Sequence, residues 1–280
     1  MIRKPIVSGQ FYSSDKEELL NSIKECFTSS FGPGSLPGSA GSLRIYGGIV
    51  PHAGYPYSGM CAAWFYKALA ESKKPDLVLI LGTNHRYKGK PCTMKGGWET
   101  PLGVAECDDE FVDLLVKHGA IESSENHQNE HSIEVQIPFL QFIYPDFKFV
   151  PLLIGDSEFE NNSALIQKAI SESGKEVIVI ASSDFTHYGV NYGYVPFTSD
   201  VKKNVYELDK GAIDFILKND AIGFNFYVSE KEATICGRNN IPVLVSLLKD
   251  KNSSLLKYYT SGDVSGDYSC CVGYGCLLFK

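Results

Sequence analysis

The sequence lacks any apolar stretch long enough to cross a membrane. Its longest apolar runs, such as residues 77–81 and 177–181, have the length of buried β-strands. Basic side chains follow the first methionine, but no apolar segment comes after them, so no signal peptide is visible. We therefore expect a cytoplasmic protein that makes no use of a membrane.

The eight cysteines lack the spacing of a structural zinc site. None of them belongs to a C-x-x-C pair, which argues against a zinc ribbon and a thioredoxin-type motif. Thiols stay reduced in a protein that is not exported. Most of these cysteines are therefore expected to be small, buried hydrophobic residues.

Positive charge is also scarce. There are 26 lysines and arginines against 33 aspartates and glutamates, a net charge of −7. A general nucleic-acid-binding protein would carry a basic patch, so we expect no nucleic-acid partner. The sequence contains no P-loop, no G-x-G-x-x-G fingerprint, no G-x-S-x-G elbow and no H-E-x-x-H motif, and it therefore shows no signature of these enzyme classes.

The sequence does contain a regular alternation of strand and helix patterns. This alternation is typical of an α/β fold with a mainly parallel central sheet and helices on both faces. The glycine- and proline-rich residues 31–42 are expected to form a surface loop, because the part before them is too short to fold alone. We therefore expect one domain over residues 1–280. Strands are expected at residues 44–51, 77–82, 147–154 and 177–182, with antiparallel edges at 255–260 and 271–279, and helices at 15–28, 58–71, 108–118, 131–143, 159–173 and 200–219.

Three of the six histidines follow the ends of predicted strands. His52, His85 and His187 each lie in a polar turn just after a strand. Ligand sites in open α/β sheets form at the carboxyl ends of strands, and imidazole is both a common metal ligand and a common general base. One such histidine could simply satisfy a backbone group in its loop. Three of them predict a shared site.

Two more residues are expected at this site. Asp184 lies three residues before His187 and could orient its imidazole, act as a base, bind metal or cap the turn. His131 is expected in the site wall with Glu134, one helical turn further on. A helix-borne zinc pair of His127 and His131 is less favoured, because the segment before His131 has the composition of a loop.

A cysteine and three tyrosines could also take part. Cys236 lies at the expected start of a helix beside Arg238, where a thiolate would be stabilised. The residues alone leave open whether it is functional or structural. Tyr55, Tyr57 and Tyr188 could line a substrate-binding crevice, although tyrosines near turns are often half-buried anchors.

Several segments of the chain, in the same order, resemble those of the Memo family, and the resemblance covers about residues 3–278. They are Pro51-His52-Ala53-Gly54-Tyr55-x-Tyr57-Ser58-Gly59, Gly82-x-Asn84-His85, Glu130-His131-Ser132-x-Glu134-x-Gln136-x-Pro138, Ser182-Ser183-Asp184-x-x-His187-Tyr188 and Cys236-Gly237. The resemblance implies a fold similar to that of class III extradiol ring-cleaving dioxygenases. Those enzymes hold non-haem Fe(II) with two histidines and a carboxylate, which a cysteine replaces in Memo-type proteins.

The resemblance also implies roles for individual residues. The metal ligands would be His52, His85 and Cys236, and His187 would take the place of the dioxygenases' acid/base histidine. Iron or copper is the expected metal and zinc is an alternative, because a thiolate makes the site softer than the usual facial triad and so admits copper and zinc beside iron. Prokaryotic members are associated with a radical-SAM protein, so a functional association of this kind is expected.

Three functions remain open. The first is a metal-dependent redox protein, similar to the dioxygenases, in which His187, Asp184 and His131 serve catalysis. The second is a non-catalytic binding or adaptor module that uses the same crevice for a peptide or small molecule. The third is a zinc hydrolase whose open metal site activates water. The sequence favours the first and does not identify a substrate.

Overall fold

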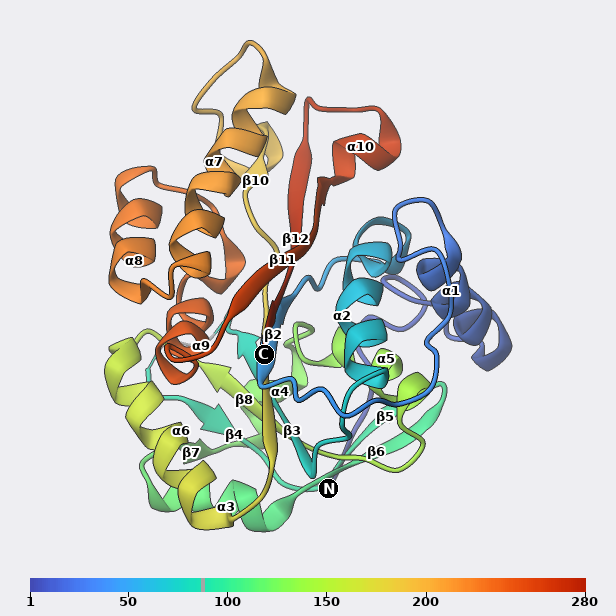
Figure 1. Ribbon diagram of the computed structural model, residues 1–280, viewed down its shortest axis with the longest axis vertical. Coiled ribbons are helices and arrows are strands. Elements are labelled where there is room, and N and C mark those ends of the chain that lie inside the picture. The colour runs from blue at the N-terminus through green and yellow to red at the C-terminus, as the bar shows by residue number, and fades with distance from the viewer. Residues whose placement is uncertain (87–88) are drawn as a thin grey trace.

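The computed structural model describes residues 1–86 and 89–280 and contains a broad central sheet (Figure 1). Within these residues twelve strands form the sheet. Its middle part is parallel and confirms the predicted α/β class. In spatial order, the parallel strands are β6 (Gly103–Cys107), β8 (Lys148–Ile154), β3 (Leu77–Thr83), β9 (Val177–Ser182) and β2 (Gly47–Val50).

Antiparallel pairs extend both sides of this parallel core. On one side β12 pairs with β2, and β10 and β11 both pair with β12. On the other side β5 pairs with β6 in an antiparallel hairpin, and the N-terminal β1 pairs with β5 in parallel. The bounds are β1 (Ile2–Arg3), β4 (Cys92–Thr93), β5 (Gly97–Thr100), β7 (Ile121–Glu122), β10 (His187–Tyr188), β11 (Ser253–Thr260) and β12 (Cys271–Phe279).

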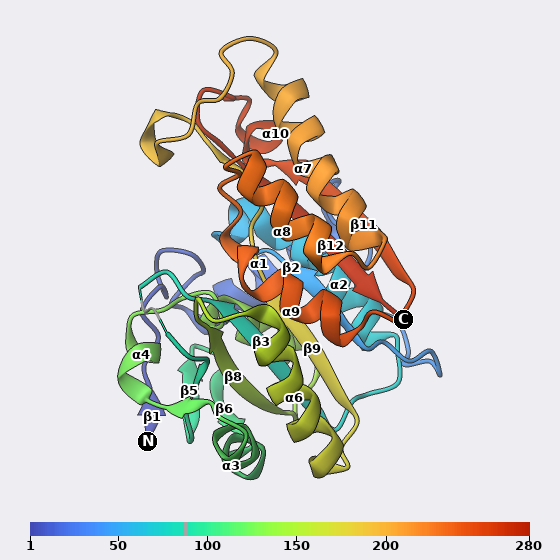
Figure 2. The same ribbon diagram turned by 90° about the vertical axis from the view of Figure 1, so that its left-hand side faces the viewer.

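Helices cover both faces of the sheet (Figures 1 and 2). The central strands are almost entirely apolar because both of their faces are buried. Val78 and Ile80 of β3 pack with the first helix layer, whereas Leu77, Leu79 and Leu81 pack with the second. The first layer contains α1 (Lys16–Thr28), α2 (Met60–Ala70) and α5 (Ile137–Ile143), and the second contains α3 (Asp109–Lys117), α6 (Phe159–Ser173), α7 (Val201–Leu217), α8 (Ala221–Glu230) and α9 (Asn240–Leu247).

One predicted helix is shorter than expected. The helix expected over residues 131–143 is a 3-10 turn, Glu134–Gln136, followed by α5. Pro138 lies in the first turn of α5, where its missing N–H would have had no helical partner. His131 therefore lies in the preceding loop, which brings it to the rim of the sheet.

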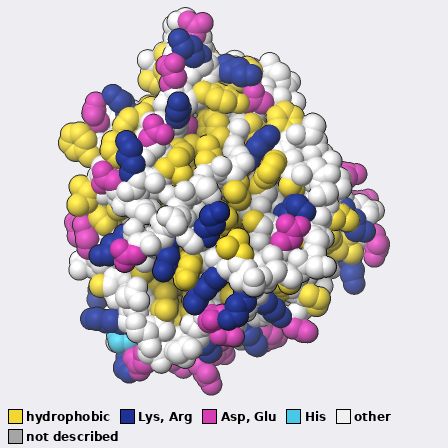
Figure 3. Space-filling view, in the orientation of Figure 1, with side chains coloured by type: hydrophobic (Ala, Val, Ile, Leu, Met, Phe, Trp, Pro, Cys, Tyr) yellow, Lys and Arg dark blue, Asp and Glu magenta, His cyan; other side chains and the backbone are white. Residues whose placement is uncertain are grey.

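The surface of the face in Figure 3 shows acidic and basic side chains interspersed, with no basic patch dominating it. In the part of the chain that the structure describes, none of the helices combines the length and apolar character required to span a bilayer. The single-domain prediction stays a prediction, although the two helix layers share one sheet.

Candidate metal centre

The predicted site residues meet at the carboxyl ends of three adjacent strands. His52 follows β2, His85 follows β3, and Asp184 and His187 follow β9. A loop and the 3-10 helix η4 (Cys236–Arg238) complete the rim. Together they surround a cavity of about 610 Å³, whose lining includes His52, His85, His131, Asp184, His187 and Cys236.

His52 is the most buried member of the site, with a relative exposure of 1%. Its Nδ1 lies 3.0 Å from the Ser182 hydroxyl, which itself donates to the carbonyl of Ser132 at 2.6 Å. A hydroxyl has only one hydrogen, so Ser182 Oγ must accept the bond from His52 Nδ1–H. In the neutral ring, the lone pair of His52 is therefore on Nε2.

That Nε2 atom is buried and has no hydrogen-bond partner among the described residues. Oδ2 of Asp184 lies 3.9 Å away, beyond hydrogen-bond distance. An unsatisfied buried polar atom is costly and usually indicates a functional role or a bound species. A metal ion beside Nε2 would satisfy it, so the donor set fits a metal.

His85 is held in the same tautomer by a carboxylate. Its Nδ1 lies 3.1 and 3.0 Å from the two oxygens of Glu130, which can only accept, so Nδ1 donates and, in a neutral ring, the lone pair is on Nε2. Glu130 also accepts the backbone N–H groups of His85 and Ser132. Burial pushes the Glu130 pKa up, but these bonds outweigh it and hold that pKa well below its usual range. A buried carboxylate that orients a histidine is a common companion of metal ligands.

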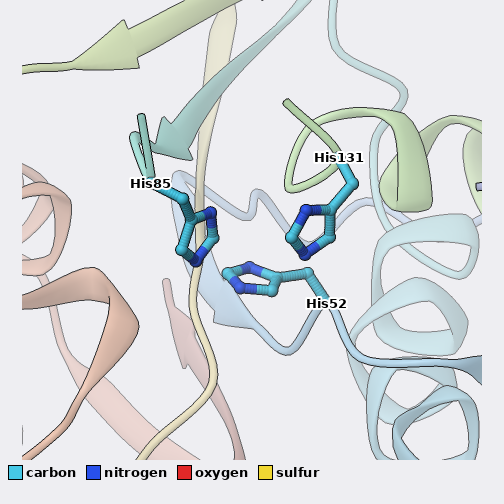
Figure 4. A group of neighbouring side chains, drawn as sticks. All are labelled: His52, His85 and His131. Atoms are coloured by element: carbon cyan, nitrogen blue, oxygen red, sulfur yellow. The ribbon is translucent and has the colours of Figure 1, made fainter. Parts of the chain in front are cut away.

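His131 lies against both of the other histidines (Figure 4). Its ring stacks on that of His85 with centroids 5.0 Å apart and meets the His52 ring edge-on at 5.5 Å. One potential ligand atom from each of His52, His85 and His131 lies within 4.8 Å of the others. The structure thus places His131 beside the two histidines that were predicted as ligands.

Burial lowers the pKa of His52, and the nearby imidazoles of His131 and His85 lower it further. The pKa of His131 is also lowered, mainly by burial, although Glu130 opposes the shift. These two rings are therefore neutral near pH 7. Neutral imidazole is the form that coordinates a metal.

A second group of potential ligands contains His52, Asp184 and Cys236, again with ligand atoms within 4.8 Å of one another. Among the described residues His85 and Cys236 do not share such a group, so the predicted set of His52, His85 and Cys236 is divided between two groups. His52 belongs to both. Oδ1 of Asp184 accepts the backbone N–H of His52 at 2.8 Å, which fixes the position of this shared residue.

Cys236 pairs with His187 on the open side of the site. His187 Nδ1 faces the carbonyl oxygens of Phe185 and Thr234 at 3.0 and 3.2 Å, so it carries a proton. His187 Nε2 lies 3.9 Å from Cys236 Sγ. His187 therefore directs its Nε2 atom toward Cys236.

The environment of Cys236 differs from the sequence-based expectation. Burial raises the pKa of its thiol well above the ordinary value, and the carboxylates of Asp184 and Glu130 raise it further. Arg238 is exposed and forms no ion pair within the described part of the chain. The protein alone thus favours the thiol, and a bound cation would be needed to deprotonate it.

The three tyrosines predicted for substrate binding occupy different surroundings. Tyr57 lines the cavity and is 46% exposed. Tyr55 is fully buried and donates to the carbonyl of Val135, and Tyr188 is buried and donates to that of Phe197. Of the three, only Tyr57 is in the lining of the cavity.

One site residue was missed from the sequence and another was misplaced. Glu130 precedes His131 in the chain but was given no role, and Glu134, which was expected in the site wall, is absent from the cavity lining. Glu134 is fully buried, and its carboxylate binds Arg3, Tyr12 and the backbone near residue 6. The only available signal for Glu130 was its position beside a histidine.

Comparison with known proteins identifies a family. The Memo family model, described as Memo-like protein, matches residues 3–278. A MEMO1 family protein of Methanopyrus kandleri is 41% identical, with 100% of this chain and 99% of that protein covered. One from Pyrobaculum arsenaticum is 40% identical, covering 99% of each chain, and one from Thermotoga neapolitana is 39% identical, covering 98% of each.

Among solved structures, an uncharacterized protein from Escherichia coli K12 aligns with a TM-score of 0.48 and 12% sequence identity. The alignment covers 84% of this chain and 99% of that one.

Proposed function

The chain belongs to the Memo family, and we propose that it is a metal-dependent redox protein that binds iron or copper at its histidine cluster. The observation that supports this most strongly is the buried Nε2 of His52, which has a lone pair and no hydrogen-bond partner among the described residues. Because a buried polar atom without a partner is destabilising, evolution would retain it where a ligand satisfies it.

His52 and His85 would hold the ion through Nε2, and the Cys236 thiolate would be the third ligand that the family resemblance implies. Both histidines have their Nδ1 protons fixed, by Ser182 and Glu130 respectively, so neither must change tautomer to bind. A bound iron or copper ion would supply one-electron exchange with a substrate or with dioxygen. A site with two imidazoles and one thiolate leaves coordination positions for such a reactant.

His187 would handle protons in this proposal. Its Nδ1–H is held by two carbonyl groups, which leaves Nε2 as the atom able to accept or return a proton on the cavity side. Asp184 lines the same cavity, and burial raises its pKa against the influence of His187. Asp184 also positions His52 by accepting its backbone N–H.

The cavity is large enough for a small organic molecule. Its walls include the rings of Phe11, Tyr57, Tyr192 and Tyr274. Aromatic walls bind planar or apolar parts of a ligand, so the expected substrate has such a part next to the group that reacts.

The test is anaerobic loading with Fe(II) or Cu(I), followed by metal analysis and oxygen uptake with a reductant present. We expect the wild type to hold about one metal ion per chain and to consume oxygen, since one donor cluster serves one ion. His52→Ala should lose both properties. His118→Ala is the matched control, because His118 pairs with Glu172 at the end of α3, away from the cluster.

A bound metal that never changes oxidation state would contradict the redox role. A wild-type protein that takes up no metal but still binds a small molecule or peptide in the cavity would favour the non-catalytic binding module instead.

A further inference from the structure

We propose that His131 is itself a metal ligand, so that His52, His85 and His131 form an all-histidine site that holds a divalent ion without Cys236. This inference rests on the proposed metal binding and extends it. The family resemblance gave His131 no ligand role, and the sequence placed it in the site wall.

The geometry of the three rings is the first support. Potential ligand atoms of His52, His85 and His131 lie within 4.8 Å of one another, and Figure 4 shows the rings gathered around a common point. Two nitrogens that are each about 2.1 Å from one ion lie at most about 4.2 Å apart. The rings therefore need only a small approach to bind a shared ion.

The surroundings of His131 keep its ring in this place. Phe11 packs edge-on against it with ring centroids 5.0 Å apart, and His85 stacks on it. Its Nδ1 lies 3.6 Å from Oε1 of Glu130. One buried carboxylate thus lies beside the Nδ1 atoms of two imidazoles, His85 and His131. The hydrogen bonds to Glu130 leave Nε2 of His85 for the ion, as in sites where carboxylates orient ligand histidines, whereas His131 Nδ1 lies beyond hydrogen-bond distance and its ring is held by packing.

The His131 side chain is also accessible, with a relative exposure of 25%, and it lines the cavity. An ion could therefore reach the three rings from the cavity. A wall residue with no ligand role would not need its ring in contact with both of the other histidines.

The proposed site has a chemical consequence for the protein. The two ligand groups of the structure share only His52, so loss of the Cys236 sulfur leaves the three imidazoles intact. Two equivalents of hydrogen peroxide oxidise a thiol to a sulfinic acid and are reduced to water, which removes the sulfur as a soft ligand. Three imidazoles still bind Zn(II), Co(II), Cu(II) or Fe(II). The centre would therefore keep its metal when Cys236 is oxidised.

The experiment is an anaerobic Co(II) titration followed by visible absorption and by the near-ultraviolet sulfur-to-cobalt charge-transfer band. The proteins are the wild type, Cys236→Ser, and Cys236→Ser combined with His131→Gln or His131→Ala. His118→Gln in the Cys236→Ser background is the matched control. Circular dichroism and melting curves establish that each variant is folded.

We expect Cys236→Ser to bind Co(II) without the charge-transfer band. Adding either His131 substitution should weaken this binding by at least about tenfold, because even substitutions of residues that only orient a ligand cost that much. His118→Gln should leave the affinity unchanged. In wild-type protein oxidised at Cys236, paramagnetically shifted imidazole N–H signals should come from three histidines, and this measurement does not depend on any variant folding.

The inference is overturned if Cys236→Ser binds no Co(II), or if the His131 substitutions leave its affinity and spectrum unchanged. A charge-transfer band in the wild type would then leave the proposed function standing. Conversely, Co(II) binding that depends on His131, together with an inert iron- or copper-loaded protein, would support the site and remove the redox function. A wild type that binds no Co(II) would overturn both.

Discussion

Glu130 is a buried carboxylate whose role in the candidate centre was not predicted from the sequence. It accepts from the ring and the backbone of His85 and from the backbone of Ser132, and it lies next to the His131 ring. A role of this kind depends on a loop approaching β3 from 45 residues away in the chain. The position of Glu130 beside His131 in the sequence does not indicate this contact with His85.

Glu130→Gln should weaken metal binding by about 10- to 100-fold, since the amide no longer fixes the Nδ1–H tautomer of His85. Competition with a chelator of known affinity measures the change. Glu125→Gln is the control, because Glu125 is an exposed glutamate in the nearby short helix α4 (Ser124–Gln128). Equal affinity for wild type and Glu130→Gln would show that the carboxylate does not orient a ligand.

Asp209 is a second buried carboxylate, next to the loop that carries the site. It accepts the backbone N–H of Thr186, between Asp184 and His187, and the hydroxyl of Tyr258. Burial raises the pKa of Asp209 to about 6, against hydrogen bonds that lower it. The folded protein therefore binds this proton more tightly than the unfolded chain does.

The sign of the resulting pH dependence follows from linkage. Between about pH 4 and pH 6 the folded state holds more protons, so the free energy of unfolding falls as pH rises, by up to about 3 kcal/mol. Asp209→Asn should remove this component, which denaturant unfolding at several pH values would reveal. Asp214→Asn, exposed on the same helix, should not. If the difference in unfolding free energy between the wild type and Asp209→Asn stays constant with pH, the raised pKa of Asp209 is refuted.

The place of a site residue could be predicted from the sequence where that residue directly follows an apolar strand. His52, His85 and His187 follow apolar strands and lie at one rim. The protonation state of Cys236 was not predictable in this way, because its pKa depends on burial and on Asp184 and Glu130, which come from other parts of the chain.

At the scale of elements, several amphipathic helices matched their predicted bounds closely. The α6 helix spans the predicted residues, and Asp15 caps α1 by accepting two backbone N–H groups. The β5–β6 hairpin was not predicted. Its strands are short and partly exposed, and β1 reaches β5 from the other end of a long chain segment.

A buried ion pair attaches the N-terminal segment to the segment that carries Glu130, His131 and Glu134. Arg3 Nη1 lies 2.7 Å from Glu134 Oε2, and the Arg3 side chain also donates to the carbonyls of His127 and Glu130. Tyr12 and the backbone of Val7 donate to the same Glu134 carboxylate. The segment thereby supports the loop that carries Glu130 and His131.

Arg3→Met should cost about 3–5 kcal/mol of unfolding free energy, because it leaves the buried Glu134 charge without its cation. Lys4→Met is a matched control, since Lys4 pairs with Glu99 on the surface, where such pairs contribute less than about 1 kcal/mol. Chemical denaturation compares the two. Similar losses for both variants would mean that the buried pair has no special role.

At the scale of the whole molecule, the parallel sheet explains why residues far apart in sequence meet. The carboxyl ends of β2, β3 and β9 lie side by side, so the loops after them share one rim. The alternation of strands and helices was enough to predict this. It could not predict which loops would reach the rim from outside the sheet, such as those with His131 and Cys236.

Among the described residues, a further cavity adjoins the rim beside the one with aromatic walls. The cavity with aromatic walls and a second cavity of about 780 Å³ are both lined by His85 and Cys236. The second is more polar and includes Asp156, Glu158 and Arg238. A metal ion at the histidine cluster would thus lie between two spaces, one for an apolar ligand part and one for a polar part.

The central claim is that His52 and His85 bind a metal through their Nε2 atoms. X-ray absorption spectroscopy of anaerobically Fe(II)-loaded protein tests it most directly, with wild type, His52→Ala and His118→Ala side by side. We predict imidazole nitrogens at about 2.0–2.1 Å and one sulfur near 2.3 Å in the wild type and in His118→Ala. His52→Ala should retain no specifically bound iron. A wild-type shell without imidazole, or an unchanged shell in His52→Ala, would contradict the account.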